Sequence, residues 1–118
     1  MASLVVKVTC GTERVETLMQ AFTVAATGLA SGLDVSVWLT GDATLHALPG
    51  TDEVEIPHSP PLSQLRDAIL AGGTLTVCAQ CAARREVTEA DLLPGARIAG
   101  AAAFVAEATA PDATALVY

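Results

Sequence analysis

Two cysteines and two arginines follow an apolar stretch in the segment "TLTVCAQCAARRE", residues 74–86. Cys78 is expected to close a strand at or just before a helix N-terminus, where free N–H groups and the helix dipole lower a thiol pKa. Cys81 lies one helical turn further along the same face, the spacing of a resolving thiol that attacks an oxidised or persulfidated Cys78. Arg84 and Arg85 add positive charge nearby. The segment therefore predicts a reactive Cys78 with Cys81 as its partner.

Other interpretations of these residues stay open on sequence alone. Free cysteines are often buried as small hydrophobes, which is favoured for Cys10 because no titratable residue lies directly beside it. A structural zinc site needs about four ligands, and beyond the cysteine pair the chain offers only Cys10, His46 and His58, all scattered. We therefore expect no metal site and no cofactor, with His46 half-buried on a helix and His58 on a loop surface. The Arg84–Arg85 pair could equally form a solvated face.

Strands and helices are expected to alternate along the chain. Short runs rich in β-branched residues predict strands, and apolar residues at three- and four-residue steps predict helices. The expected strands lie within residues 3–8, 33–39, 74–78, 94–100 and 113–118. The expected helices run from a Thr12 cap to Gly32, from Thr40 or Asp42 to about residue 48, from a Ser59 cap to Gly72, and from Gly100 to about Ala108. Thr88–Asp91 resembles a capping box, and the Pro-rich loop before Ser59 has room for a short edge strand around Val54.

This alternation predicts an α/β fold, with one domain over residues 1–118 and a three-layer α/β/α arrangement around a parallel sheet of about five strands. Ligand sites in such sheets gather at the carboxyl ends of the strands. That rule selects Cys10 with Gly11, Gly41 with Asp42, and Cys78 as candidate site residues. Asp42 has a simpler interpretation as a helix cap.

Composition narrows the partners that the chain can have. A formal net charge of −7 makes nucleic acid and anionic membranes poor partners. Apolar residues make up 52% of the chain, yet no run approaches the ~20 residues that span a bilayer. Without a secretion signal in "MASLVVKVTC", the 3 cysteines fit a reducing cytoplasm. The apolar excess, concentrated in the final helix, predicts a homo-oligomer with Phe104 and Val105 near a subunit contact.

Three segments, in this order, cover nearly the whole chain: "AFTVAATGLASGLDVSVWLTGDATLHAL", "TLTVCAQCAARRE" and "VTEADLLPGARIAGAAAFVAEA". Their order and spacing resemble the DsrE/DsrF-like family, particularly its small C-x-x-C members described as predicted peroxiredoxins. The resemblance implies a parallel-sheet domain that assembles into a homotrimer or homohexamer. It also implies that Cys78 is the cysteine that carries sulfur as a persulfide, with Cys81 as the additional thiol. Glu86 stands where many members have a glycine, which places an acidic group beside Arg84 and Arg85.

The sequence thus supports three functional hypotheses. The first is a cytoplasmic sulfur carrier with sulfurtransferase-like activity, in which Cys78 accepts a sulfane sulfur and passes it to a protein thiol, and Cys81 releases it. In this hypothesis the substrate-binding candidates are Arg84, Arg85, Cys10, Gly11, Gly41 and Asp42. The second is a thiol–disulfide or peroxide-reactive protein that uses the same two cysteines. The third is a noncatalytic assembly module, which buried and unreactive thiols would favour.

Overall fold

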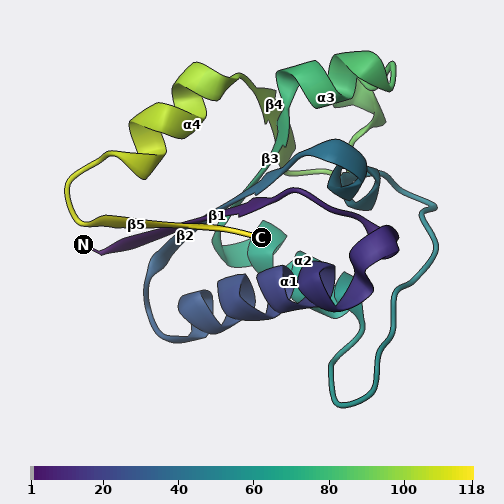
Figure 1. The fold of residues 1–118 in the computed structure, drawn as a ribbon, viewed down its shortest axis with the longest axis horizontal. Helices are drawn as coiled ribbons and strands as arrows, with labels where there is room; N and C mark the ends of the chain where they lie inside the picture. The colour runs from purple at the N-terminus through teal and green to yellow at the C-terminus, as the bar shows by residue number, and fades with distance from the viewer. Residues whose placement is uncertain (1) are drawn as a thin grey trace.

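Five short runs rich in valine, leucine and alanine form one parallel sheet in the computed structural model, which describes residues 2–118 (Figure 1). The strands are β1 (Ser3–Val8), β2 (Asp34–Leu39), β3 (Thr74–Cys78), β4 (Ala96–Ala99) and β5 (Ala113–Val117). Their order across the sheet is β4-β3-β2-β1-β5, and every neighbouring pair is parallel. The predicted α/β class with about five parallel strands is confirmed.

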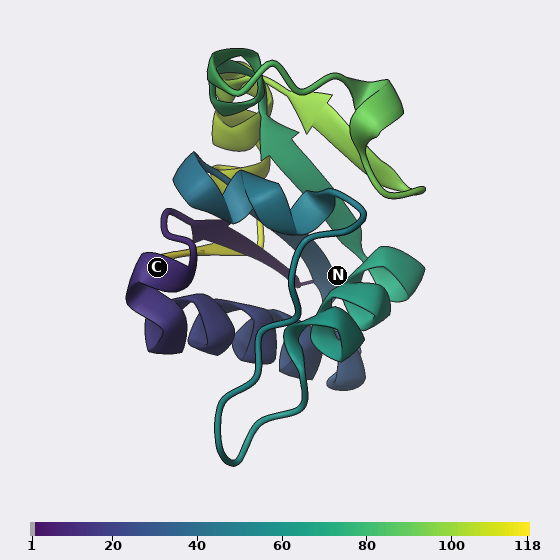
Figure 2. The same ribbon diagram turned by 90° about the vertical axis from the view of Figure 1, so that its right-hand side faces the viewer.

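Helices cover both faces of this sheet. The helices α1 (Val15–Ala30) and α2 (Leu62–Gly72) lie on one face, and α4 (Ala101–Ala108) lies on the other (Figure 1). The short helix α3 (Ala79–Arg84) follows β3, while three 3₁₀ segments complete the fold: η1 (Thr12–Arg14), η2 (Gly41–Ala47) and η3 (Glu89–Asp91). Figure 2 shows η2 lying across the end of the sheet, where it packs on β2, β3 and α3. None of the helices in residues 2–118 combines the length and the hydropathy that crossing a bilayer requires.

The two faces of the sheet differ in chemistry. The α1 and α2 side is apolar, and its buried residues include Leu4, Val6, Val8, Leu18, Phe22, Val37, Leu39, Ile69, Leu75 and Val77. The α4 side carries a row of polar and aromatic side chains. The register aligns Lys7 with Trp38, Trp38 with Thr76, and Thr76 with Arg97. Side chains alternate between the faces of a strand, so this row crosses four strands on one face. The apolar face holds the fold together, and the polar face is available for chemistry.

Three predicted helix caps are wrong. Neither Thr40 nor Asp42 caps the segment after β2, which is the 3₁₀ helix η2: the Thr40 hydroxyl donates to the Val8 carbonyl at 2.8 Å, and Asp42 lies inside η2. Thr12 does not cap α1, because residues 12–14 form the tighter η1 turn and Glu13 Oε1 accepts the N–H of Gly11 at 2.7 Å. Ser59 does not cap α2, which begins only at Leu62. A residue that precedes a proline avoids helical backbone, so Pro60 before Pro61 delays the helix.

Other local predictions have mixed outcomes. No strand forms around Val54; its side chain is buried and its carbonyl accepts the N–H of Leu62 at 3.0 Å, which ties the loop to α2 instead. Gly32 follows α1 with φ of 86°, the left-handed conformation expected of a glycine past a helix end. The capping box of Thr88 and Asp91 is present at η3.

Candidate functional site

The predicted site residues follow strands that end at one edge of the sheet. The N–H of Gly41, after β2, donates a hydrogen bond to the Cys81 sulfur at 3.2 Å, which joins this loop to α3. Gly11, after β1, packs so tightly on the same loop that an added Cβ would lie 2.9 Å from the Cβ of Asp42. The structure therefore brings Gly11, Gly41, Asp42 and Cys81 together where the carboxyl ends of β1, β2 and β3 meet.

Cys78 is the most accessible of the three free thiols. It is half-buried, whereas Cys10 and Cys81 are buried. Cys78 ends β3 and is the N-cap residue of α3. It opens into a small cavity of about 40 Å³ between the sheet and α4. This cavity, called the Cys78 cavity below, is lined by Lys7, Trp38, Thr40, Cys78, Ala101 and Phe104.

The surroundings of Cys78 favour its thiolate form. Burial alone would raise the pKa of Cys78, but the backbone N–H groups of Cys81 and Gln80, the Cys81 thiol and the Lys7 ammonium outweigh it and lower the pKa overall. Neither N–H group makes a capping hydrogen bond with the Cys78 side chain, so both favour the thiolate as nearby dipoles. The direction of this shift is the one expected for a thiol at a helix N-terminus, and it increases the thiolate fraction of Cys78 at any given pH.

Cys81 is held firmly beside Cys78. Its side chain is 8% exposed, and its sulfur accepts the N–H of Gly41. The Arg85 guanidinium donates to the Cys81 carbonyl at 3.2 Å and to Asp42 Oδ1 at 2.8 Å. Arg85 and Asp42 thus form a brace between α3 and the loop after β2. Both residues were predicted to bind substrate, and the structure shows them bound to each other.

Arg84 differs from Arg85 in being exposed on α3. Glu86 is the last residue of the cysteine segment 74–86. Its φ of 54° is a left-handed conformation that costs free energy for any residue but glycine. A glycine would adopt this backbone conformation without that cost. Glu86 is exposed, so it faces solvent near the surface that Arg84 occupies.

Cys10 is not part of this cluster. Its side chain is 2% exposed and belongs to the apolar core on the α1 side, with the sulfur 3.8 Å from the Arg14 carbonyl oxygen. Burial raises the pKa of Cys10 and the Glu13 carboxylate raises it further, while Arg14 offsets part of the effect. The environment of Cys10 therefore suppresses the reactivity that the environment of Cys78 promotes.

Lys7, Trp38 and Phe104 complete the Cys78 cavity and were missed as site residues. The rings of Trp38 and Phe104 meet edge to face with centroids 5.5 Å apart, and the Lys7 Nζ lies 5.0 Å from the Phe104 centroid. One signal was present in the sequence, because Lys7 is the only lysine and interrupts the apolar strand "SLVVKV". A lysine in a strand covered on both faces is costly to bury and marks a candidate functional residue.

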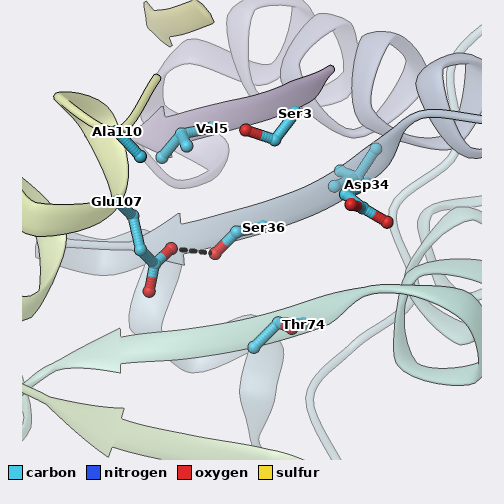
Figure 3. Close-up of a pocket in the computed structure, with 8 residues that line it drawn as sticks. Ser3, Val5, Asp34, Ser36, Thr74, Glu107 and Ala110 are labelled. Atoms are coloured by element: carbon cyan, nitrogen blue, oxygen red, sulfur yellow. Dashed lines mark hydrogen bonds between the residues drawn. The ribbon is translucent and has the colours of Figure 1, made fainter. Parts of the chain in front are cut away.

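Glu107 anchors α4 over the sheet. Its carboxylate accepts hydrogen bonds from the Ser36 hydroxyl at 2.5 Å, shown in Figure 3, from Trp38 Nε1 at 3.1 Å and from Arg97 Nη2 at 2.7 Å. Arg97 also donates to the Thr76 hydroxyl at 2.8 Å. Burial would raise the pKa of Glu107, but these donors and the Arg97 charge lower it, so the group stays ionised. The network fixes the helix that roofs the Cys78 cavity.

A larger cavity of about 280 Å³ lies on the same face of the sheet but at its other end (Figure 3). It is lined by Ser3, Val5, Asp34, Val35, Ser36, Thr74, Glu107 and Ala110. Ser3, Asp34 and Thr74 are the first residues of β1, β2 and β3. Because parallel strands end where the site residues lie, this cavity is separated from Cys78 by the length of the strands.

The histidines take no part in the cluster around Cys78. His46 is 3% exposed in η2, more buried than expected, and burial followed by the Arg66 charge lowers its pKa, against an opposing effect of Glu53. His58 is exposed on the loop before α2. Within residues 2–118, no three or more His, Cys, Asp or Glu side chains converge in an arrangement that could hold a metal ion.

Comparison with known proteins places the chain in a family. The family model described as the DsrE/DsrF-like family matches residues 4–114. The chain belongs to the DsrE/DsrF-like family. A curated relative, the uncharacterized protein MJ0989 of Methanocaldococcus jannaschii, is 32% identical over 75 residues, which cover 64% of each chain. The present chain therefore spans 64% of the length of the curated relative that it matches.

Solved structures show the DsrE/DsrF-like fold. The crystal structure of the ychN protein from E. coli matches with a TM-score of 0.84 and 20% identity, covering 100% of both chains. A protein of unknown function from Methanobacterium thermoautotrophicum, MTH1491, matches with a TM-score of 0.70 and 10% identity, again over 100% of both chains. At these identities the similarity establishes the arrangement of strands and helices.

The opposite pKa shifts of Cys78 and Cys10 predict selective alkylation by iodoacetamide. Because a lowered pKa populates the thiolate at lower pH, Cys78 should react first, with its half-maximal rate at a lower pH than in the unfolded protein. Cys10, buried and with a raised pKa, should react last and only at higher pH. Mass spectrometry of the cysteine peptides across a pH series measures both profiles. Urea-unfolded protein is the control, in which the cysteines should react alike; the same result in folded protein would contradict the prediction.

Proposed function

We propose that this DsrE/DsrF-like protein is a cytoplasmic sulfur carrier that holds a sulfane sulfur as a persulfide on Cys78. One observation carries the proposal: Cys78 alone combines partial exposure and a lowered pKa with an adjoining cavity of about 40 Å³. That volume holds roughly one to three water molecules, which suits one added sulfur atom. The association of the family with sulfur relay supports the same chemistry.

The transfer needs no external oxidant or reductant. The Cys78 thiolate attacks the terminal sulfur of a donor persulfide, so that a new S–S bond forms and the donor S–S bond breaks. The donor leaves as a thiolate and takes up the proton that its terminal sulfur carried. An acceptor protein thiolate then attacks the same terminal sulfur, and Cys78 leaves as a thiolate. Sulfur passes from one thiol to another without net oxidation, so the activity is that of a sulfurtransferase.

Cys81 provides a second route for releasing the sulfur. Its thiolate attacks Sγ of persulfidated Cys78, a Cys78–Cys81 bond forms, and hydrosulfide leaves. The resulting disulfide requires two electrons from an external dithiol before Cys78 can react again. The Gly41 N–H and the Arg85–Asp42 brace support this role because they hold Cys81 beside Cys78. Arg84, exposed on α3, is proposed to attract the donor or acceptor protein.

Sulfur loading on Cys78 is tested by intact mass measurement after incubation with a small-molecule persulfide. Wild-type protein should gain the mass of one sulfur atom, Cys78→Ser should gain none, and the matched control Cys10→Ser should behave as wild type. Release through Cys81 would also leave wild-type protein without the added sulfur and with two hydrogens fewer, so Cys81→Ser, which cannot close the disulfide, makes the decisive measurement. Cys81→Ser should keep one added sulfur atom; Cys81→Ser that gains none, or Cys78→Ser that gains as much, would reject the proposal and favour thiol–disulfide chemistry at the same pair.

The assembly proposed for this protein is a homotrimer or homohexamer. No residue of α4 is buried within the chain, Val105 is 55% exposed, and Val117 on the edge strand β5 is 65% exposed. Phe104 turns toward Trp38, so Val105 is the residue of the predicted pair that points away from the sheet. These exposed apolar side chains support a subunit contact along α4 and β5.

Light scattering at micromolar concentration measures this assembly. We expect the mass of three or six chains for wild type and a smaller species for Val105→Glu, because a carboxylate in an apolar contact is costly to bury. Thr109→Glu, just beyond the end of α4, serves as the control with the same added charge. A monomer mass for wild-type protein would contradict the proposed assembly.

A further inference from the structure

Lys7 is a cation with no acidic partner among residues 2–118. It lies on β1, next to the centre of the sheet, and its side chain is half-buried beneath α4. None of the three ion pairs among residues 2–118 includes Lys7. The Phe104 ring, 5.0 Å from Nζ, returns only part of the cost of removing an ammonium group from water. An ammonium group that is partly removed from water is stabilised by a nearby anion. No carboxylate among residues 2–118 forms an ion pair with Lys7.

The other charged groups around the Cys78 cavity are already paired. Arg97 and Glu107 form an ion pair of 2.7 Å beside Trp38, which neutralises both. On the α3 side, Arg85 is bound to Asp42. This leaves Lys7 as the cation of the cavity and the Cys78 and Cys81 thiols as the groups that can become anionic within the cluster.

The cavity brings Lys7 and Cys78 to one small space. Both residues line it, together with the rings of Trp38 and Phe104. Lys7 aligns with Trp38, and Trp38 aligns with Thr76, which is two residues before Cys78 on the same face of β3. Lys7 and Cys78 therefore lie diagonally across β2 from each other on this face of the sheet. The Lys7 charge contributes to the lowered pKa of Cys78, which agrees with this placement.

We propose that Lys7 is a positioning residue that stabilises the anionic sulfur at Cys78, first the thiolate and then the terminal sulfur of the persulfide. The inference rests on the proposed function for its second part, since it assigns a charge to the carried sulfur. It identifies the carried group as one sulfane sulfur, delivered by a donor persulfide and held as the persulfide anion, because the cavity combines one cation with room for about one sulfur atom. The aromatic walls exclude water and strengthen the attraction of Lys7 for that anion.

Paired alkylating reagents test the charge effect without any persulfide. Iodoacetate and iodoacetamide differ mainly in charge, so their rate ratio at Cys78 reports an attracting cation near the sulfur. We expect Lys7→Met to lower the iodoacetate-to-iodoacetamide ratio roughly threefold or more, a size typical of a partly buried charge interaction, and to move the pH profile of Cys78 upward. Lys7→Arg should keep the wild-type ratio. A wild-type ratio in a folded Lys7→Met protein would overturn the inference.

A second measurement uses wild-type protein and does not depend on the folding of a Lys7 variant. Because Lys7 is the only lysine, ¹³C-lysine labelling gives one side-chain NMR signal. That signal should shift over the pH range in which Cys78 ionises, and the shift should be absent in Cys78→Ser. A signal that ignores the ionisation of Cys78 would overturn the inference.

The two proposals fail in distinguishable ways. If the alkylation ratio depends on Lys7 but no sulfur is loaded, Lys7 stabilises the thiolate and the sulfur-carrier proposal is wrong. If sulfur loads normally on Cys78 and the iodoacetate-to-iodoacetamide ratio is the same in wild type and Lys7→Met, the carrier proposal stands and the Lys7 inference is wrong. Sulfur loading that is slowed in Lys7→Met and restored in Lys7→Arg supports both.

Discussion

The Glu107 carboxylate holds α4 against the sheet, and the Cys78 cavity exists because α4 lies there. None of the α4 residues is buried, so apolar packing contributes little to fixing this helix. Three donors on β2 and β4, namely Ser36, Trp38 and Arg97, converge on the carboxylate instead. The aromatic contact between Trp38 and Phe104 adds a further attachment. Because α4 carries both Glu107 and Phe104, the network that fixes the helix also closes the cavity above Cys78.

The two faces of the sheet have different roles: one face forms the apolar core, and the other holds the side chains around Cys78. The α1 and α2 side is a closely packed apolar core that includes Cys10, and burial there raises the pKa of this thiol. The α4 side carries the row of Lys7, Trp38, Thr76 and Arg97. Trp38, Thr76 and Arg97 are joined by hydrogen bonds to one another or to Glu107, whereas Lys7 lies against the Phe104 ring. Cys78 ends its strand on this second face. The partial exposure and the lowered pKa of Cys78 therefore follow from the side of the sheet on which it lies.

The sequence predicted the elements well and the site only in part. The strands could be predicted because parallel strands that are buried on both faces are short runs rich in β-branched residues. The placement of Gly41, Asp42 and Cys78 at one end of the sheet followed from the rule that ligand sites in parallel sheets lie at the carboxyl ends of the strands. Local helix starts were harder, since the Pro60–Pro61 pair and the Glu13 side chain competed with the expected caps. Glu107 was beyond prediction, because its partner Ser36 lies 71 residues away. Lys7 could have been predicted as a site residue, because it is the single lysine of the chain and lies inside an apolar strand.

The central claim is that sulfur is carried on Cys78, inside the cavity formed by Lys7, Trp38 and Phe104. A crystal structure of wild-type protein treated with a persulfide donor tests this most directly, because it shows both the atom that is modified and the space that the added sulfur occupies. The account predicts one additional atom bonded to Cys78 Sγ, within the cavity and facing the Lys7 ammonium. Density for an added sulfur on Cys10 or Cys81, or on Cys78 but directed out into solvent, would contradict it.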